Sequence, residues 1–121
     1  MVRTLYWYDL ETTGTDSIMD RPLQFAGIRT DLELNELESP QNFLGLPGTD
    51  VLPQPEALLV TGISLVEVEE KGLRERVFTA KVLEQFSRSE TCVVGFNNLR
   101  FDDEFVRQML YRNFYDPYAR E

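Results

Sequence analysis

Histidine is absent from the 121-residue chain, and cysteine occurs once, as Cys92. Histidine is the commonest general base and the commonest zinc ligand in proteins, so this chain alone holds no Ser-His-Asp triad, Cys-His dyad or Cys/His zinc site. A single cysteine forms no internal disulfide. Because Cys92 lies in an apolar run, we expect a buried thiol and a reducing, cytoplasmic setting.

Long hydrophobic runs are also missing. No stretch of 18 apolar residues occurs, so we expect no transmembrane helix and no membrane partner. The N-terminus, MVRTLYWYDLE, reaches carboxylates before a long apolar segment forms, which argues against a secretory signal. The chain has no repeat and no low-complexity stretch, and its length suits one domain.

Basic residues are few: 12 Lys and Arg face 21 Asp and Glu, for a net charge of −9. Taken alone, this balance disfavours nucleic acid, whose binding proteins usually carry a basic face. Two explanations remain open. The acids form a solvated surface, or some of them gather around divalent metal ions.

The hydrophobic pattern predicts an α/β domain. Thr4 to Tyr8 reads TLYWY, a run dense enough to indicate a strand buried on both faces. Further strands are expected at 24–30, 40–46 and 91–96, with the first three strands joined as hairpins. Helices are expected at 53–59, 64–72, 73–86 and 101–114. The last helix carries an apolar stripe of Phe101, Phe105, Val106, Met109 and Leu110.

Acidic residues follow two of these strands. Asp9 and Glu11 are two residues apart, so the period of a strand places both side chains on one face. Close carboxylates repel, and a divalent cation relieves the repulsion; the alternative is a solvated pair at a strand end. Asp102 and Asp103 open the last helix, where acids also stabilise free N–H groups. If Asp102 converges on the pair, the three acids form an oxygen-rich site for Mg²⁺ or Mn²⁺, suited to phosphoryl chemistry.

Two segments resemble a known family. Residues 9–14, DLETTG, resemble the first motif, D-x-E-T-x-G, of the DEDD 3′–5′ exonucleases. Residues 98–102, NLRFD, resemble their second motif, N-x-x-F-D, in the family's order and at a suitable distance. Further segments, among them 20–22, 52–55 and 111–119, resemble the N-terminal portion of bacterial members, so the likeness covers essentially the whole chain.

The resemblance implies a ribonuclease-H-like exonuclease fold, with a mixed central sheet flanked by helices. Residues 1–121 are then the N-terminal part of an exonuclease domain, truncated at its C-terminus. The implied activity is the removal of nucleotides from the 3′ end of single-stranded DNA. It depends on Mg²⁺, or Mn²⁺, held in a two-metal site that this chain completes only in part.

The resemblance also assigns residues. Asp9, Glu11 and Asp102 match three of the four DEDD acids, as metal ligands and catalytic residues. Glu11 also lies near the terminal nucleotide, in a pocket lined by Leu10 and Thr12, with Thr61 as a further candidate. Arg107 and Tyr118 fall in segments that contact single-stranded DNA.

One departure limits the resemblance. The family's third motif holds a His and the fourth acid, and this sequence has no His. We therefore expect an isolated chain that is inactive or severely impaired. Two alternatives remain: an exoribonuclease of the same superfamily, because the acids do not distinguish sugars, and a non-catalytic fragment that binds a partner or a DNA end.

Overall fold

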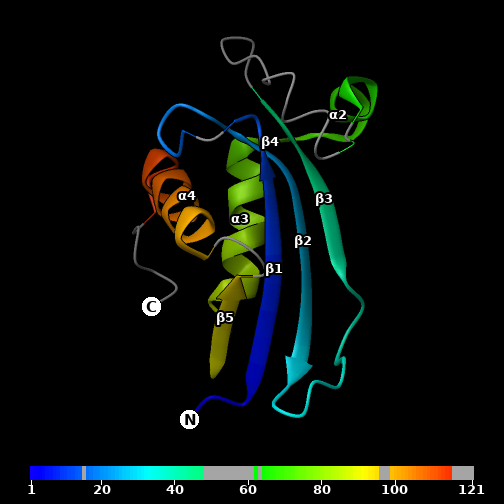
Figure 1. Cartoon of the computed structure of the whole chain (residues 1–121), viewed down its shortest axis with the longest axis vertical. Coiled ribbons are helices and arrows are strands. Elements are labelled where there is room, and N and C mark those ends of the chain that lie inside the picture. Colours follow the sequence, from blue (N-terminus) through cyan, green and yellow to red (C-terminus); the bar gives the residue numbers. More distant parts are fainter. Residues whose placement is uncertain (15, 48–61, 63, 96–98, 116–121) are drawn as a thin grey trace.

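A computed structural model of the chain describes residues 1–14, 16–47, 62, 64–95 and 99–115, with the side chains of residues 65 and 99–103 left out. A five-stranded sheet has the order β4-β3-β2-β1-β5 (Figure 1). The strands are β1 (Thr4–Thr12), β2 (Pro22–Asp31), β3 (Gln41–Leu46), β4 (Leu73–Arg74) and β5 (Thr91–Gly95). The helices are α2 (Leu65–Lys71), α3 (Glu75–Phe86) and α4 (Leu99–Arg112).

The sheet is mixed. β1, β2 and β3 are antiparallel neighbours, which confirms the predicted hairpin-connected trio. β5 joins β1 on the other side and runs parallel to it. The strand β1 therefore has a hydrogen-bonded neighbour on both sides, and its carboxyl end lies at the same edge of the sheet as that of β5.

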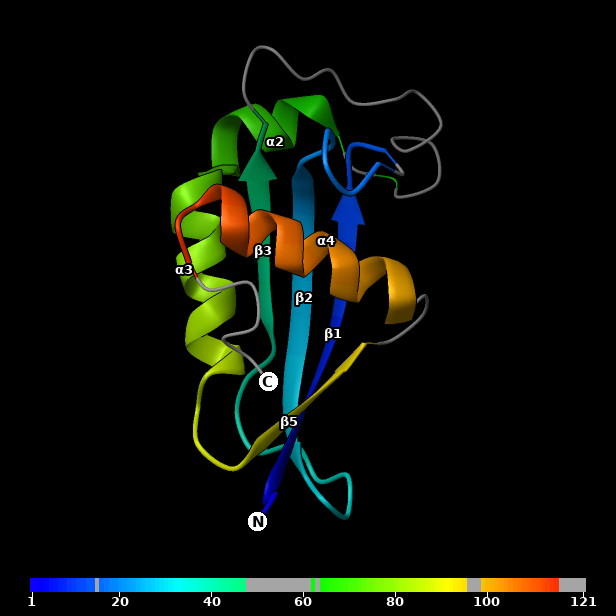
Figure 2. The same ribbon diagram turned by 90° about the vertical axis from the view of Figure 1, so that its left-hand side faces the viewer.

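Helices α3 and α4 lie on the same face of the sheet, with α4 crossing the strands (Figure 2). Tyr6, Tyr8 and Leu10 point from β1 into this layer and are at most 5% exposed. The aromatic ring of Phe25 stacks against both tyrosines. The predicted apolar stripe of α4 is confirmed where it is described, since its members are fully buried: Phe105, Val106, Met109 and Leu110. These side chains form the core.

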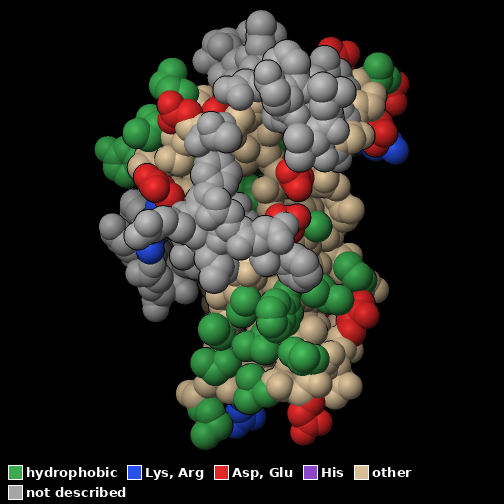
Figure 3. Space-filling model, viewed as in Figure 1, with side chains coloured by type: hydrophobic (Ala, Val, Ile, Leu, Met, Phe, Trp, Pro, Cys, Tyr) green, Lys and Arg blue, Asp and Glu red, His purple; other side chains and the backbone are tan. Residues whose placement is uncertain are grey.

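The other face of β1 corrects the expectation of a strand buried on both faces. Burial alternates along β1, and the odd-numbered residues, Trp7 among them, are only half-buried. Figure 3 shows hydrophobic side chains gathered on the surface over β1 and β5. Cys92, paired in register with Leu5, is exposed. The prediction of a buried thiol is therefore wrong, because hydrophobic runs do not reveal which face of a strand a helix covers.

Three of the four predicted helices are confirmed with shifted bounds. Ser64 caps α2 by accepting a hydrogen bond from the Val66 amide, 3.2 Å away. Gly72 ends α2 at a φ of −66°, so the glycine is not needed for a left-handed turn. It is needed for space, because a Cβ there would lie 2.4 Å from the Val68 carbonyl oxygen.

Two further predictions concern the region around α3. The helix expected at 73–86 begins only at Glu75, because residues 73–74 pair with β3 as the short strand β4. The short helix expected at 53–59 lies outside the described residues. Within the described part of the chain, no helix is both long and apolar enough to cross a membrane.

Candidate active site

Asp9 and Glu11 lie near the carboxyl end of β1. Their partners on β2 are Ala26 and Gln24. On the other side, the pairing with β5 stops at Tyr8 and Gly95, one residue before Asp9. Both acids therefore lie at the edge of the sheet where the parallel strands β1 and β5 have their carboxyl ends. This is the position at which α/β sheets commonly place ligands.

Both carboxylates belong to the half-buried face of β1, opposite the core residues Tyr8 and Leu10. Asp9 also lines an open pocket of about 310 Å³ that includes Trp7 and Ile28. Burial raises the pKa of the Glu11 carboxyl above its ordinary value, and the negative charge of Asp9 raises it further. The folded chain thus concentrates negative charge at this point, and oxygen donors of this kind fit Mg²⁺ or Mn²⁺.

Asp102 lies in the first turn of α4, and nothing is described of its side chain. Among the described side chains, no group of three His, Cys, Asp or Glu residues forms a metal site. The convergence of Asp102 with Asp9 and Glu11 therefore stays a prediction. It is motivated by the chain order, in which α4 follows β5, the strand that pairs with β1 as far as Tyr8.

Two residues assigned to the nucleotide pocket, Leu10 and Thr12, occupy buried positions of β1, whereas Asp9 and Glu11 occupy half-buried ones. Leu10 packs into the core, so only its backbone is available at the site. Thr12 is buried, and its hydroxyl donates a hydrogen bond to the Gly14 carbonyl. Arg107 is half-buried in the middle of α4, while Thr61 and Tyr118 lie outside the described residues.

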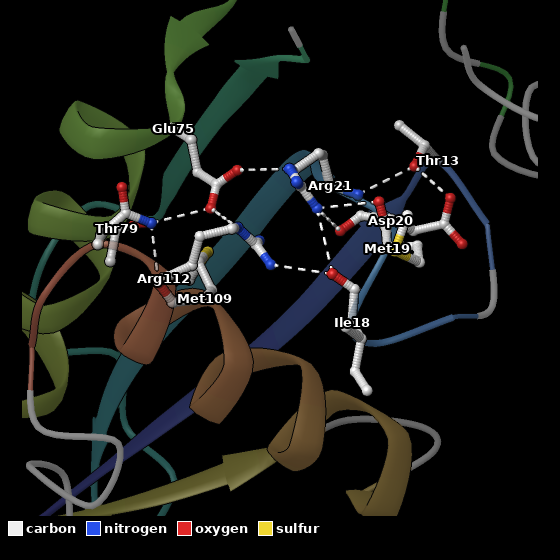
Figure 4. A network of polar contacts seen from close by, with 10 residues as sticks. Thr13, Ile18, Met19, Asp20, Arg21, Glu75, Thr79, Met109 and Arg112 are labelled. Atoms are coloured by element: carbon white, nitrogen blue, oxygen red, sulfur yellow. Dashed lines mark hydrogen bonds and ion pairs between the residues drawn. The ribbon is translucent and has the colours of Figure 1, made fainter. Parts of the chain in front are cut away.

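A polar network next to the site was not foreseen. It joins the connection between β1 and β2 to the first residue of α3, Glu75, and the last residue of α4, Arg112 (Figure 4). Glu75 and Arg112 are 37 residues apart and belong to different helices. No spacing pattern in the sequence links them, so only the folded structure reveals the contact.

The fold and the two carboxylates define a class of protein. The chain matches the model of the Exonuclease family (RNase_T) over residues 6–121, and it belongs to this family. Its mixed five-stranded sheet with helices is a ribonuclease-H-like α/β fold, as the first motif indicates.

Within the family, the chain is similar to exodeoxyribonuclease I. The Escherichia coli K12 protein is 50% identical over 116 residues, which cover 96% of this chain and 24% of that protein. The Haemophilus influenzae protein is 49% identical over 115 residues, covering 95% and 24%. The chain therefore spans about a quarter of the length of these relatives.

Solved structures of exonuclease I are also similar to this chain. A product-bound structure of exonuclease I matches with a TM-score of 0.94 at 48% identity, covering 100% of this chain and 28% of that chain. Escherichia coli exonuclease I in complex with a dT13 oligonucleotide matches with a TM-score of 0.92 at 49% identity, covering 98% and 25%.

Proposed function

We propose that residues 1–121 form the N-terminal part of the exonuclease domain of a metal-dependent 3′–5′ exonuclease that removes nucleotides from single-stranded DNA. The observation that supports this most directly is the pairing of Asp9 and Glu11 on one face at the end of β1, beside the start of α4. The similarity to exodeoxyribonuclease I, one structure of which holds a dT13 oligonucleotide, supports the choice of substrate.

In this proposal Asp9, Glu11 and Asp102 hold the metal. Bound Mg²⁺ or Mn²⁺ supplies a water activated for attack and positive charge that stabilises the attacking and leaving oxygens. The chain's own part is to hold the carboxylates in place. Pairing with β2 sets the direction of Asp9 and Glu11, and the proposal assigns to the first turn of α4 the role of bringing Asp102 to them. Because the pKa of Glu11 is raised, protonation competes with metal binding at a higher pH than for a Glu carboxyl of ordinary pKa.

The contacts with DNA are also proposals. Glu11, the Leu10 backbone and Thr12 border the terminal nucleotide, with Thr61 as a further member of the pocket. Arg107 and Tyr118 contact the strand behind it. A cytoplasmic location is part of the proposal as well, since DNA and a reduced Cys92 thiol are both compatible with it.

Two rivals remain. The first is an exoribonuclease, because the acids contact phosphate and metal rather than the sugar. The second, for this chain by itself, is a non-catalytic fragment that binds a DNA end or a partner, which the absence of His favours.

The test is digestion of a 3′-labelled single-stranded oligonucleotide with Mg²⁺ or Mn²⁺, with matched RNA and duplex DNA as competing substrates. We expect the chain of residues 1–121 to release mononucleotides at no more than about a thousandth of the rate of a relative with all three motifs, because a general base alone contributes about 10²–10⁴-fold. Glu11→Ala serves as the control for a contaminating nuclease.

The outcomes separate the rivals. Release of mononucleotides that prefers DNA and disappears in Glu11→Ala supports the proposal, and rapid release would show that the chain is self-sufficient. Preference for RNA supports the first rival. Metal and DNA binding without any release supports the second, whereas an Asp9 and Glu11 pair that binds no metal contradicts the proposal.

A further inference from the structure

Glu75 joins two arginines from different parts of the chain. Its Oε1 accepts a hydrogen bond from Arg112 Nε at 2.6 Å, and its Oε2 lies 3.3 Å from Arg21 Nε. The Oε1 atom also accepts a hydrogen bond from Asn113 Nδ2 at 2.8 Å. The three charged side chains are between 18% and 24% exposed. We call Glu75, Arg21 and Arg112 the Glu75 cluster (Figure 4).

Both arginines hold the connection between β1 and β2, whose described residues, 13, 14 and 16–21, are called here the 13–21 loop. The Nη1 atoms of Arg21 and Arg112 donate to the same carbonyl oxygen, that of Ile18, at 3.3 and 3.4 Å. Arg21 Nη1 also donates to the carbonyls of Met19 at 2.9 Å and Asp20 at 3.1 Å. The cluster therefore clamps the outer turn of the loop to the ends of α3 and α4.

The inner end of the loop is closed by a second set of contacts. The hydroxyl of Thr13, which is fully buried, donates to Asp20 Oδ1 at 2.8 Å. The other oxygen of Asp20 accepts from the Asp16 amide at 2.9 Å. The amide of Arg21 donates to the Thr13 hydroxyl at 3.0 Å. A displacement at Arg21 is thus passed directly to Thr13, two residues after Glu11.

Strand pairing does not hold this region by itself. The ladder between β1 and β2 shifts register between Glu11 and Thr12 and resumes with Thr12 opposite Pro22. One residue further on, the Thr13 amide donates a hydrogen bond to the Arg21 carbonyl at 2.9 Å. The position of Thr12 and Thr13 relative to the carboxylates therefore depends on the backbone of Pro22 and Arg21 as well as on the side-chain contacts of the 13–21 loop.

We propose that Glu75 is a positioning residue for the terminal nucleotide. Through Arg21 and Arg112 it holds the 13–21 loop in the position that allows a nucleoside monophosphate to bind beside Asp9 and Glu11. This inference rests on the proposed function. Without the Glu75 carboxylate the two guanidinium groups repel each other, and Arg112 Nη2 is already buried without a hydrogen-bond partner among the described residues. Arg21 and Arg112 are then no longer held in one orientation, and the loop is no longer held in one position.

The competing explanation is that the cluster only stabilises the fold. The two explanations differ in the folded protein: a stabilising role lowers the melting temperature alone, whereas a positioning role also weakens nucleotide binding well below the melting temperature. Glu75→Gln removes the charge with little change in shape. Glu84→Gln is the matched control, because Glu84 lies on the same helix and is exposed.

The experiment titrates dTMP into the 121-residue chain with saturating Mn²⁺, using calorimetry, and titrates Mn²⁺ alone. Trp7, the single tryptophan, lines a pocket with Asp9 and reports metal binding by its fluorescence. We expect Glu75→Gln to weaken dTMP binding about tenfold, the effect of one charge-assisted contact, and to leave Mn²⁺ binding unchanged. Glu84→Gln should leave both titrations unchanged. If Glu75→Gln does not fold, Glu75→Asp keeps the charge with a shorter reach and should weaken dTMP binding by a smaller factor.

Wild-type and variant results answer different questions. Equal dTMP affinity in the wild type and in Glu75→Gln would overturn the positioning role and leave the proposed function standing. Where Glu75→Gln does not fold, the same comparison is made with Glu75→Asp. A wild type that binds Mn²⁺ but no dTMP removes the nucleotide pocket, and this inference with it. A wild type that binds neither contradicts the proposed function itself.

Discussion

Neutralising Glu11 should stabilise the metal-free chain at neutral pH. In Glu11→Gln the side chain keeps its size and loses the charge that burial and Asp9 disfavour. Residues two apart on a strand are separated by about 6.6 Å. At that distance two unit charges repel by about 0.6 kcal/mol in water and about 2.5 kcal/mol at an effective dielectric constant of 20.

Both side chains are half-exposed, so the gain in the free energy of unfolding lies toward the lower end of this range. After screening by solvent we expect about 0.5–1 kcal/mol, which raises the melting temperature of a chain of this length by about 2–4 °C. Because the pKa of Glu11 is raised in the folded state, its stabilising contribution is complete below the pKa of the unfolded chain and is lost as the pH rises through the folded-state pKa. The advantage of Glu11→Gln should therefore appear at neutral pH and vanish in acid.

The assay is thermal unfolding followed by circular dichroism, with chelator, at about pH 7.5 and about pH 4. Asp9→Asn should act in the same direction at neutral pH, and Glu69→Gln, an exposed position on α2, is the matched control. With Mn²⁺ the order of stability reverses, and the wild type becomes more stable than the variants. Metal at about a hundredfold above its dissociation constant adds about 2.7 kcal/mol to the free energy of unfolding of the wild type, and less to that of either site variant. A destabilised Glu11→Gln at neutral pH, or a metal response equal to that of the wild type, would refute the reasoning.

Three further predictions concern the fold around the site. Arg29→Met should lower the free energy of unfolding, measured with denaturant, by about 3 kcal/mol, because the 4%-exposed guanidinium of Arg29 donates to both the Thr4 hydroxyl and the Gln85 carbonyl, and methionine removes both hydrogen bonds; unchanged stability would contradict this account. Gly45→Ala should cost about 1–3 kcal/mol by the same measurement, since the new Cβ would lie 2.4 Å from a backbone carbonyl oxygen. Cys92 should react with a maleimide in native buffer as completely as in denaturant, because it is exposed, and protection in the native state would show that its face is covered.

Much of the site could be predicted because it depends on local rules. The alternation of a strand is enough to place Asp9 and Glu11 on one face, and both lie on the half-buried face of β1. The apolar stripe of α4 follows from helical periodicity, and Phe105 and Met109 are fully buried as expected. The first motif also pointed to the family that the whole-chain comparison shows. Local periodicity needs only neighbouring residues, so it can be read without a structure.

Tertiary structure decided the features that depend on distant segments. The exposure of Cys92 follows from α3 and α4 lying on one face of the sheet, which no single strand pattern reveals. The parallel pairing of β5 with β1 sets where α4 starts relative to Asp9. Glu75 meets Arg112 only because two helix ends converge on one loop. Side chains pack and pair in three dimensions, so contacts between residues far apart in the sequence produce no periodic pattern along the chain. The sequence alone determined which chemical groups this protein has, and the packing decided which of these groups lie together.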